Sequence, residues 1–295
     1  MKNKNLIIGF IASTSMTMVV SCGGSGEDDI QNVVLTDTAT VVEAPQPTVE
    51  YAVPTPNELF EIIKLQGGKQ KVGLVNDLNN RGNYVELKSK ALNFGVYSAD
   101  LAYMSCFGIG TEFLMYFKAI EEIGEELGIS GAFDEELMER IENNEGDTDS
   151  LFSISNDTYY DSYLYLEEND KGVELSLIMA GGFIESLYIV THLVDKFKEG
   201  DPIIEKIGDQ KLVLENLLDF IIEYSDDQSV SEVMDDLISL SQVFETSMEF
   251  EESGTNIDNS NGKIVLSGGG SYKMTKSSLE KIKAKAKELR DNITK

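Results

Sequence analysis

Histidine is nearly absent from this chain, which has a single one, His192, among 295 residues. Zinc hydrolase motifs need at least two histidines, and di-iron bundles need a Glu-x-x-His motif on each of two helices. Neither type of metal centre can be built from this sequence. It also has no Gly-x-Ser-x-Gly elbow and no P-loop, which removes two common hydrolase and nucleotide-binding patterns. No metal or cofactor site is predicted.

Cysteine is almost as scarce, with only Cys22 and Cys106 in the chain. Cys106 lies in an apolar stretch, so we expect a buried and inert thiol. A catalytic cysteine needs a histidine partner, and His192 is the only candidate. Because Cys22 has another predicted role, described below, no disulfide within the chain is expected and the fold must be held by its core.

Positive charge is also in short supply. The chain has 24 lysines and arginines against 52 aspartates and glutamates, for a net charge of −28. Nucleic-acid binding depends on basic side chains that neutralise phosphates, so nucleic acid is excluded as a partner. The same charge disfavours adhesion of the folded body to an anionic membrane surface. Cationic partners, or partners bridged by a divalent metal, suit this charge.

The first residues have the layout of a secretory signal, because Lys2 and Lys4 precede an apolar run from Leu6 to Val20. This run of about 15 residues is shorter than the roughly 20 that cross a bilayer as a helix, which argues against a permanent membrane helix. We predict a signal peptide over residues 1–21. Its removal takes away two lysines and no acid, so the net charge changes from −28 to −30.

A cysteine preceded by branched aliphatic residues and one small residue ends this apolar run. The segment Val19, Val20, Ser21, Cys22 resembles the lipobox of bacterial lipoproteins. The resemblance implies that Cys22 is acylated and becomes the N-terminus of the mature chain, and two or more acyl chains anchor a protein stably. Gly23, rather than aspartate, follows the cysteine, which in this family implies sorting to the outer membrane.

Small residues and acids come next, at 23–29. This run resembles the surface-export tag of some Gram-negative lipoproteins, and an ordinary solvated linker has the same composition. Residues 22–56 hold four of the five prolines, so we predict a lipidated, extended tether. The sequence thus predicts a lipid-anchored protein of the outer membrane that faces either the periplasm or the cell surface.

Helical patterns dominate residues 57–295, which we expect to form a single all-α domain. The patterns predict about eight to ten helices, packed as an antiparallel bundle or an irregular helical stack. A solenoid of helical hairpins is the alternative, without support from a clear repeat period. A glycine-rich polar stretch at 251–272 interrupts the pattern, and at most a short β element is expected near 263–273.

Two predicted helices, at 85–107 and 173–197, are apolar nearly all round and so belong in the core. Both contain a Gly-x-aromatic-x-x-x-Leu pattern, which indicates either a duplication or a chance match between two apolar helices. Small residues let helix backbones approach, so we expect a close crossing of the two helices. These small residues are Ala91, Gly95 and Ala99 on the first helix and Gly181 and Gly182 on the second.

Polar side chains nevertheless follow one face of each of these helices, at spacings of three and four residues. The stripe on the later helix consists of Glu185, Tyr188, His192 and Asp195, and the stripe on the earlier helix of Asn93, Tyr97 and Asp100. A histidine between two carboxylates can bind a cation or transfer a proton. The solvent-facing edge of a buried helix gives the same pattern. Two stripes that faced each other across a groove would favour a functional site.

Two further helices offer candidate surfaces. The helix at 149–168 is rich in tyrosines, which either bind sugars or peptides or pack in the core with solvated hydroxyls. These tyrosines are Tyr159, Tyr160, Tyr163 and Tyr165. The last helix begins at Thr275 or Ser277 and lies within residues 273–295, which hold eight basic and three acidic side chains. We expect it to dock across the acidic body through a seam of Leu279, Ile282 and Leu289.

These observations favour a lipid-anchored envelope protein that binds a ligand or a protein partner. The expected partners are the membrane, through the lipid on Cys22, and an envelope protein. A hydrolase-like enzyme that uses Glu185, His192 and Asp195 is the second hypothesis, and a purely structural envelope component is the third. A convergent pocket around His192 would favour the enzyme, whereas an exposed apolar or tyrosine-rich patch would favour binding.

Overall fold

The computed structural model describes residues 55–109, 112–133, 135–144, 146–251, 256–258, 265–267 and 271–295. Cys22, the predicted signal peptide at 1–21 and the predicted tether as far as Pro54 lie outside these ranges. All of the described residues belong to one compact unit.

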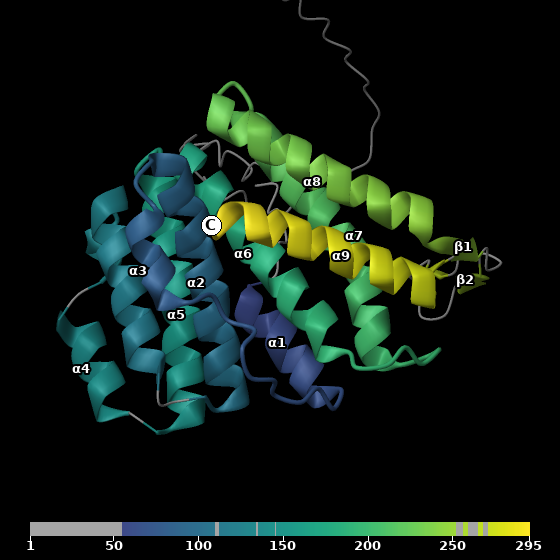
Figure 1. The fold of residues 1–295 in the computed structure, drawn as a ribbon, viewed down its shortest axis with the longest axis horizontal. Helices are drawn as coiled ribbons and strands as arrows, with labels where there is room; N and C mark the ends of the chain where they lie inside the picture. The colour runs from purple at the N-terminus through teal and green to yellow at the C-terminus, as the bar shows by residue number, and fades with distance from the viewer. Residues whose placement is uncertain are drawn as a thin grey trace, which may run out of the picture. The chain divides into compact units, whose positions relative to one another are not determined.

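The fold is all-α, as the helical patterns predict. The described residues form nine α-helices: α1 (Pro56–Leu65), α2 (Leu87–Phe107), α3 (Phe113–Leu127), α4 (Glu135–Asn143), α5 (Thr148–Glu168), α6 (Gly172–Leu193), α7 (Pro202–Ile221), α8 (Gln228–Ser247) and α9 (Lys276–Ile293). Short 3-10 turns lie between some of them: η1 (Leu78–Asn83), η3 (Ser130–Ala132) and η4 (Ile222–Tyr224). Figure 1 shows their arrangement.

Helices α2 and α6 form the centre of the stack and are buried along most of their length. They pack against each other more extensively than any other pair of described elements, and α1, α3, α5, α7, α8 and α9 pack around one or both of them. In a solenoid each repeat contacts only its neighbours. The domain is therefore an irregular helical stack around two central helices.

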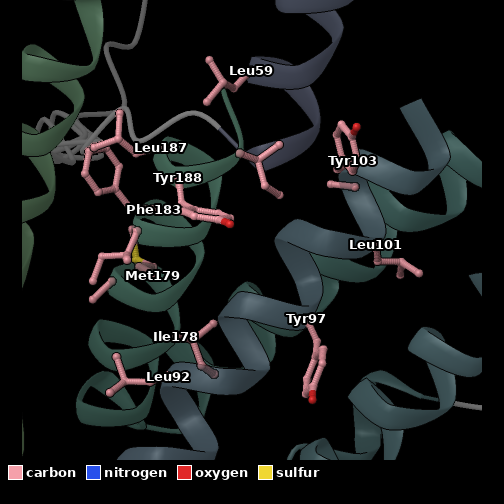
Figure 2. Packing of buried hydrophobic residues seen from close by; sticks show 14 of the residues in the cluster. Leu59, Leu92, Tyr97, Leu101, Tyr103, Ile178, Met179, Phe183, Leu187 and Tyr188 are labelled. Atoms are coloured by element: carbon pink, nitrogen blue, oxygen red, sulfur yellow. The ribbon is translucent and has the colours of Figure 1, made fainter. Parts of the chain in front are cut away.

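Glycines set the distance between these two helices. A Cβ atom on Gly95 would lie 2.0 Å from the carbonyl oxygen of Ile178, and one on Gly181 would lie 2.0 Å from that of Leu92. Such separations are far below van der Waals contact, so both positions require glycine. The predicted close crossing is confirmed. Figure 2 shows side chains of α2 and α6 packed around it, among them Leu92 and Ile178.

By length and hydropathy α6 is long and apolar enough to cross a membrane, and it is the one such helix within the described ranges. Most of its surface is buried against other helices of the same domain. A helix at the centre of a globular core has the same composition, so this observation by itself carries no membrane assignment.

Helix α6 ends four residues earlier than the apolar pattern predicts. Its last residue is Leu193, and Val194 has an extended backbone with φ −78° and ψ 113°. The ammonium of Lys71 donates a hydrogen bond to the carbonyl oxygen of His192 at 2.6 Å, which satisfies one of the free carbonyls of the last turn. Asp195 therefore lies beyond the helix, and its predicted place on the helical stripe is wrong.

Side-chain caps define the starts of the first and the last described helix. Thr55 and Glu58 form a reciprocal capping box at α1, and Pro56 occupies the first helical turn. The first helix therefore starts one residue before the predicted domain boundary at 57. Thr275 caps α9, which is one of the two predicted starts of that helix.

Four short strands connect α8 to α9. β1 (Glu249–Glu251) pairs antiparallel with β4 (Ser271–Lys273), and β2 (Asn256–Asp258) pairs antiparallel with β3 (Val265–Ser267). The β element expected near 263–273 is present, and its pairing reaches back to Glu249. The strands place Tyr272 beside α7, where the Lys211 ammonium lies 4.8 Å from the centroid of the tyrosine ring.

Helix α9 docks on α6 and α8, and Figure 1 shows it lying across α6. Leu279, Ile282 and Leu289 are buried, so the predicted seam is confirmed. At the end of the helix, the side-chain amide of Asn93 donates to the carbonyl oxygen of Ile293 at 2.6 Å. The C-terminal helix is thus tied to both central helices.

Candidate functional site

The two polar stripes meet inside the domain rather than across a groove. Asp100 of α2 and Glu185 of α6 are both 0% exposed, and each affects the ionisation of the other. Arg290 of α9 donates from Nε to Glu185 Oε2 at 2.8 Å and from Nη2 to Oε1 at 3.2 Å. We call Asp100, Glu185 and Arg290 the acid–arginine cluster. The alternative interpretation, in which these two acids lie at the solvent-facing edge of a helix, is therefore wrong.

The irregular segment at 66–86, between α1 and α2, covers this cluster. The backbone N–H of Asn76 donates to Asp100 Oδ2 at 2.9 Å, and Arg290 Nη2 donates to the carbonyl oxygen of Leu74 at 3.2 Å. The Tyr116 hydroxyl of α3 donates to the Asn76 carbonyl oxygen at 2.7 Å. Polar groups from α2, α3 and α9 therefore hold a segment that has little regular hydrogen bonding of its own.

The cluster contains two buried carboxyl groups but one guanidinium. Burial and the charge of Glu185 hold the pKa of Asp100 well above its usual range. Burial also raises the pKa of Glu185, while Arg290 opposes this shift. Desolvation lowers the pKa of Arg290, but the charge and hydrogen bonds of Glu185 outweigh it and the net shift is upward. We infer that Glu185 and Arg290 form an ion pair at neutral pH while Asp100 carries a proton, because a second buried carboxylate would lack a counter-ion.

A proton held by Asp100 in the folded state would make the stability of the fold depend on pH. The pKa of Asp100 in the folded state is raised above its unfolded value of about 4. The contribution of this proton to the free energy of unfolding is therefore fully present below about pH 4 and is lost as the pH rises through the folded pKa. Asp100→Asn imitates the protonated carboxyl group, since an amide can accept from Asn76 and donate to Glu185. In urea unfolding at pH 5, 7 and 9, we expect the unmodified chain to lose stability relative to this variant by about 1.4 kcal/mol per pH unit until the folded pKa is passed.

Asp226→Asn provides the control, because Asp226 is an exposed acid and not a helix cap. It should follow the pH profile of the unmodified chain. Parallel profiles for Asp100→Asn and the unmodified chain would mean that Asp100 is ionised in the folded state, and the assignment of the proton would be wrong.

The rest of the α6 stripe is divided between the interior and the surface. The Arg290 guanidinium lies 4.4 Å from the ring centroid of Tyr188, which stacks on His192 at 4.1 Å between centroids. His192 Nδ1 donates to the Tyr188 carbonyl oxygen at 2.6 Å. Burial and the nearby lysines lower the pKa of His192, so its ring is mainly neutral at pH 7. Asp195 is exposed and pairs with Lys71 at 2.6 Å.

The structure does not bring together the three residues of the enzyme hypothesis. Glu185 is enclosed with Arg290 in the core, whereas the Asp195 side chain is 80% exposed. His192 lies between them, half-buried and with one ring nitrogen already in a hydrogen bond. This arrangement does not place an acid, a base and a substrate in one pocket.

The α2 stripe also serves the interior. The Tyr97 hydroxyl donates to the Asp77 carbonyl oxygen at 3.0 Å, and burial raises the pKa of this tyrosine. The Asn93 amide also donates to the Ser89 carbonyl oxygen at 2.9 Å. Of the seven stripe residues, only Asp195 is largely exposed to solvent. Apart from Asp195, the stripe residues therefore lie in the interior or at its edge, where they help to join α2, α6, α9 and the 66–86 segment.

Arg290, which organises the cluster, is not among the residues that the stripes predict. A signal for it exists, because Arg290 lies one turn after Ala286 and two turns after Ile282, on the buried face of α9. An arginine on an apolar face indicates a buried acidic partner. Asn76 gives no such signal, since the 66–86 segment has no helical or strand periodicity.

Two open hollows lie on the described surface. The larger of two, about 790 Å³ in volume, lies between η1 and α3. Two of its charged lining residues, Arg81 and Glu122, already form an ion pair with each other at 3.2 Å. The buried Tyr116 at this hollow connects it to the 66–86 segment.

The second hollow, of about 540 Å³, lies between α7, the connection from α6 to α7, and strands β1 and β4. We call it the acidic groove. Its lining includes an apolar set, Phe197, Ile204, Tyr272 and Met274, and a charged set, Glu199, Glu205, Asp209, Glu251 and Lys273. Binding sites commonly combine apolar surface with a few placed polar groups. The acidic groove has this combination, with a surplus of carboxylates.

The other candidate residues in the described part of the chain give weaker support for a functional site. On α5, Tyr160 is exposed, whereas Tyr159, Tyr163 and Tyr165 are half-buried, as aromatics at the edge of a core are. Cys106 is buried, as predicted, and burial raises the pKa of its thiol to about 11, which disfavours the reactive thiolate. Within the described ranges, no three His, Cys, Asp or Glu side chains are arranged to hold a metal ion.

No protein-family model matches the chain, and no curated protein or solved structure is significantly similar to it. The assignment of a site therefore depends on the geometry of this chain.

Proposed function

We propose that the protein is a lipid-anchored component of the bacterial envelope whose helical domain binds a protein partner. The acidic groove is the observation that carries this proposal. It is open to solvent, it joins apolar and charged side chains, and its rim acids Glu199, Glu205, Asp209 and Glu251 are exposed. The polar residues with catalytic potential are instead engaged in and around the acid–arginine cluster.

The anchor in this proposal is the lipobox-like segment that ends at Cys22. Acylation of Cys22 would attach the mature chain to the outer membrane, and the proline-rich tether would separate the domain from the lipid. A chain of this length and composition can extend to roughly 100 Å. The acidic groove would then reach partners that do not lie directly at the membrane surface.

Crosslinking of intact cells, followed by purification of the full chain and mass spectrometry, tests the proposal. We expect one envelope protein to be recovered in amounts comparable to the chain itself. His192→Ala should leave this recovery unchanged, because His192 is not required for binding. Cys22→Ser should release the chain from the membrane fraction, since a serine cannot carry the thioether-linked lipid.

Two outcomes would contradict this function. A purification without any stoichiometric partner would argue against a partner-binding protein and would favour the hypotheses of an enzyme or a structural component. Retention of Cys22→Ser in the membrane fraction would argue against the lipid anchor. These outcomes are independent, because one concerns the folded domain and the other the N-terminal segment.

A further inference from the structure

Lysines of this chain already show how the acidic groove accommodates a cation. The Lys273 ammonium lies 2.6 Å from a carboxylate oxygen of Glu199 and 3.4 Å from one of Glu251. Beside it, the Lys211 ammonium sits over the ring of Tyr272. Carboxylates and aromatic faces both attract the charged end of a lysine or arginine side chain.

The groove holds more negative charge than Lys273 neutralises. Glu205 and Asp209 are one helical turn apart on α7 and both are exposed. Asp209 pairs with Lys206 at 2.7 Å, whereas Glu205 has no ion-pair partner within the described residues. Four carboxylates thus line the groove together with a single lysine. This surplus attracts a cationic ligand, and the exposed position of the carboxylates makes the attraction sensitive to salt.

Apolar surface below the rim suits the rest of such a ligand. The accessible apolar surface comes from Tyr272, which is 47% exposed, and from the half-buried Phe197, while Ile204 and Met274 are buried beneath them. Lysine and arginine carry apolar stems that pack on such surfaces while their charged ends reach carboxylates. A ligand that alternates basic and aliphatic side chains would match both parts of the groove.

We propose that the acidic groove binds a short cationic, amphipathic segment of a protein partner, and that a basic residue of this segment displaces Lys273 from Glu199 and Glu251. This inference depends on the proposed function and specifies the class of partner. The displacement costs little, because exposed ion pairs contribute little to stability and Lys273 can turn to solvent. A second copy of this chain fits less well, since two mature chains of net charge −30 repel each other.

A peptide titration tests the groove directly. The probe is a fluorescent, amidated heptapeptide of alternating lysine and leucine, and the same peptide with glutamate in place of lysine is its control. The protein is the full mature chain with Cys22→Ser, which carries no lipid and needs no detergent. Fluorescence anisotropy at low and at physiological salt gives the affinity, and melting curves show that each variant folds.

Matched variants separate the groove from the overall negative charge. Glu205→Gln with Asp209→Asn alters the rim, and Glu136→Gln with Glu139→Gln makes the same charge change on exposed residues of α4. Figure 1 shows α4 at the opposite side of the view from β1. Because the two double variants have equal net charge, they attract the peptide equally over long distances. We expect the rim variant to bind about tenfold more weakly than the α4 variant.

Lys273→Met removes the resident cation and should strengthen peptide binding by about fivefold relative to Lys276→Met. Lys276 is an exposed lysine on α9, and its substitution makes the same charge change.

Equal affinities for the rim and α4 variants, or weaker binding by Lys273→Met, would overturn the inference. If the crosslinked partner is still recovered with the rim variant, the partner binds elsewhere and the proposed function survives alone. If the unmodified chain recovers no partner, the proposed function fails whatever the peptide shows.

Discussion

Arg290→Met is expected to lower the free energy of unfolding by about 3–5 kcal/mol. The substitution leaves the buried Glu185 carboxylate without its counter-ion and removes the hydrogen bond to the Leu74 carbonyl oxygen. Methionine keeps most of the apolar stem of the arginine, so lost packing accounts for little of the change. Urea unfolding of the full mature chain at pH 7 measures the effect.

A second variant and a control assign this loss to the buried pair. Glu185→Gln combined with Arg290→Met should recover much of the stability, because a buried amide needs no counter-ion. Lys287→Met on the same helix removes a surface pair with Asp291 and should have a much smaller effect. If Lys287→Met is as damaging as Arg290→Met, the loss reflects the helix as a whole and not the buried charge.

The second large effect is expected at the crossing of α2 and α6. Gly181→Ala would place a Cβ atom 2.0 Å from the carbonyl oxygen of Leu92, and a backbone oxygen cannot move aside unless the helices separate. The separation would open the most extensive helix contact in the described domain. We expect a loss of at least about 3 kcal/mol, at the upper end for an overpacked core.

Gly182→Ala is the matched control on the next residue of the same helix. Its Cβ atom would lie 3.4 Å from the nearest atom, the Gly95 carbonyl oxygen, which is close to ordinary contact. Alanine is also a better helix former than glycine by about 1 kcal/mol. The variant should therefore unfold at the same or a slightly higher urea concentration than the unmodified chain. Equal midpoints for the two alanine variants would mean that the crossing is looser than described.

The central helices could be predicted from sequence because their signals are local. An apolar surface all round a helix means burial, and small residues at helical spacing mean a close neighbour. The end of α6 could not be predicted so well, because Lys71, which caps its last turn, lies 121 residues away from His192 in the chain. The apolar residues Val194 and Phe197 continue the pattern past the last helical residue, Leu193, so the sequence gives no indication of the end of the helix.

The polar stripes show where prediction from one sequence stops. Spacing places Glu185, Tyr188 and His192 on one face of a helix, but it does not say what that face meets. Burial of Glu185 depends on Arg290, which lies 105 residues later. The acidic groove has still weaker signals, since it is assembled from a loop, one face of α7 and three-residue strands. Such a surface becomes visible only when the segments are placed together.

The position of Arg290 also affects the order in which the chain can fold. It supplies contacts to Glu185, 105 residues earlier, and to the Leu74 carbonyl oxygen, 216 residues earlier. Contacts between such distant positions form late and slow folding. A nascent chain would keep an unneutralised Glu185 and an unclosed core until α9 emerged. For a protein with a predicted secretory signal, this delay would help to keep the chain unfolded during translocation.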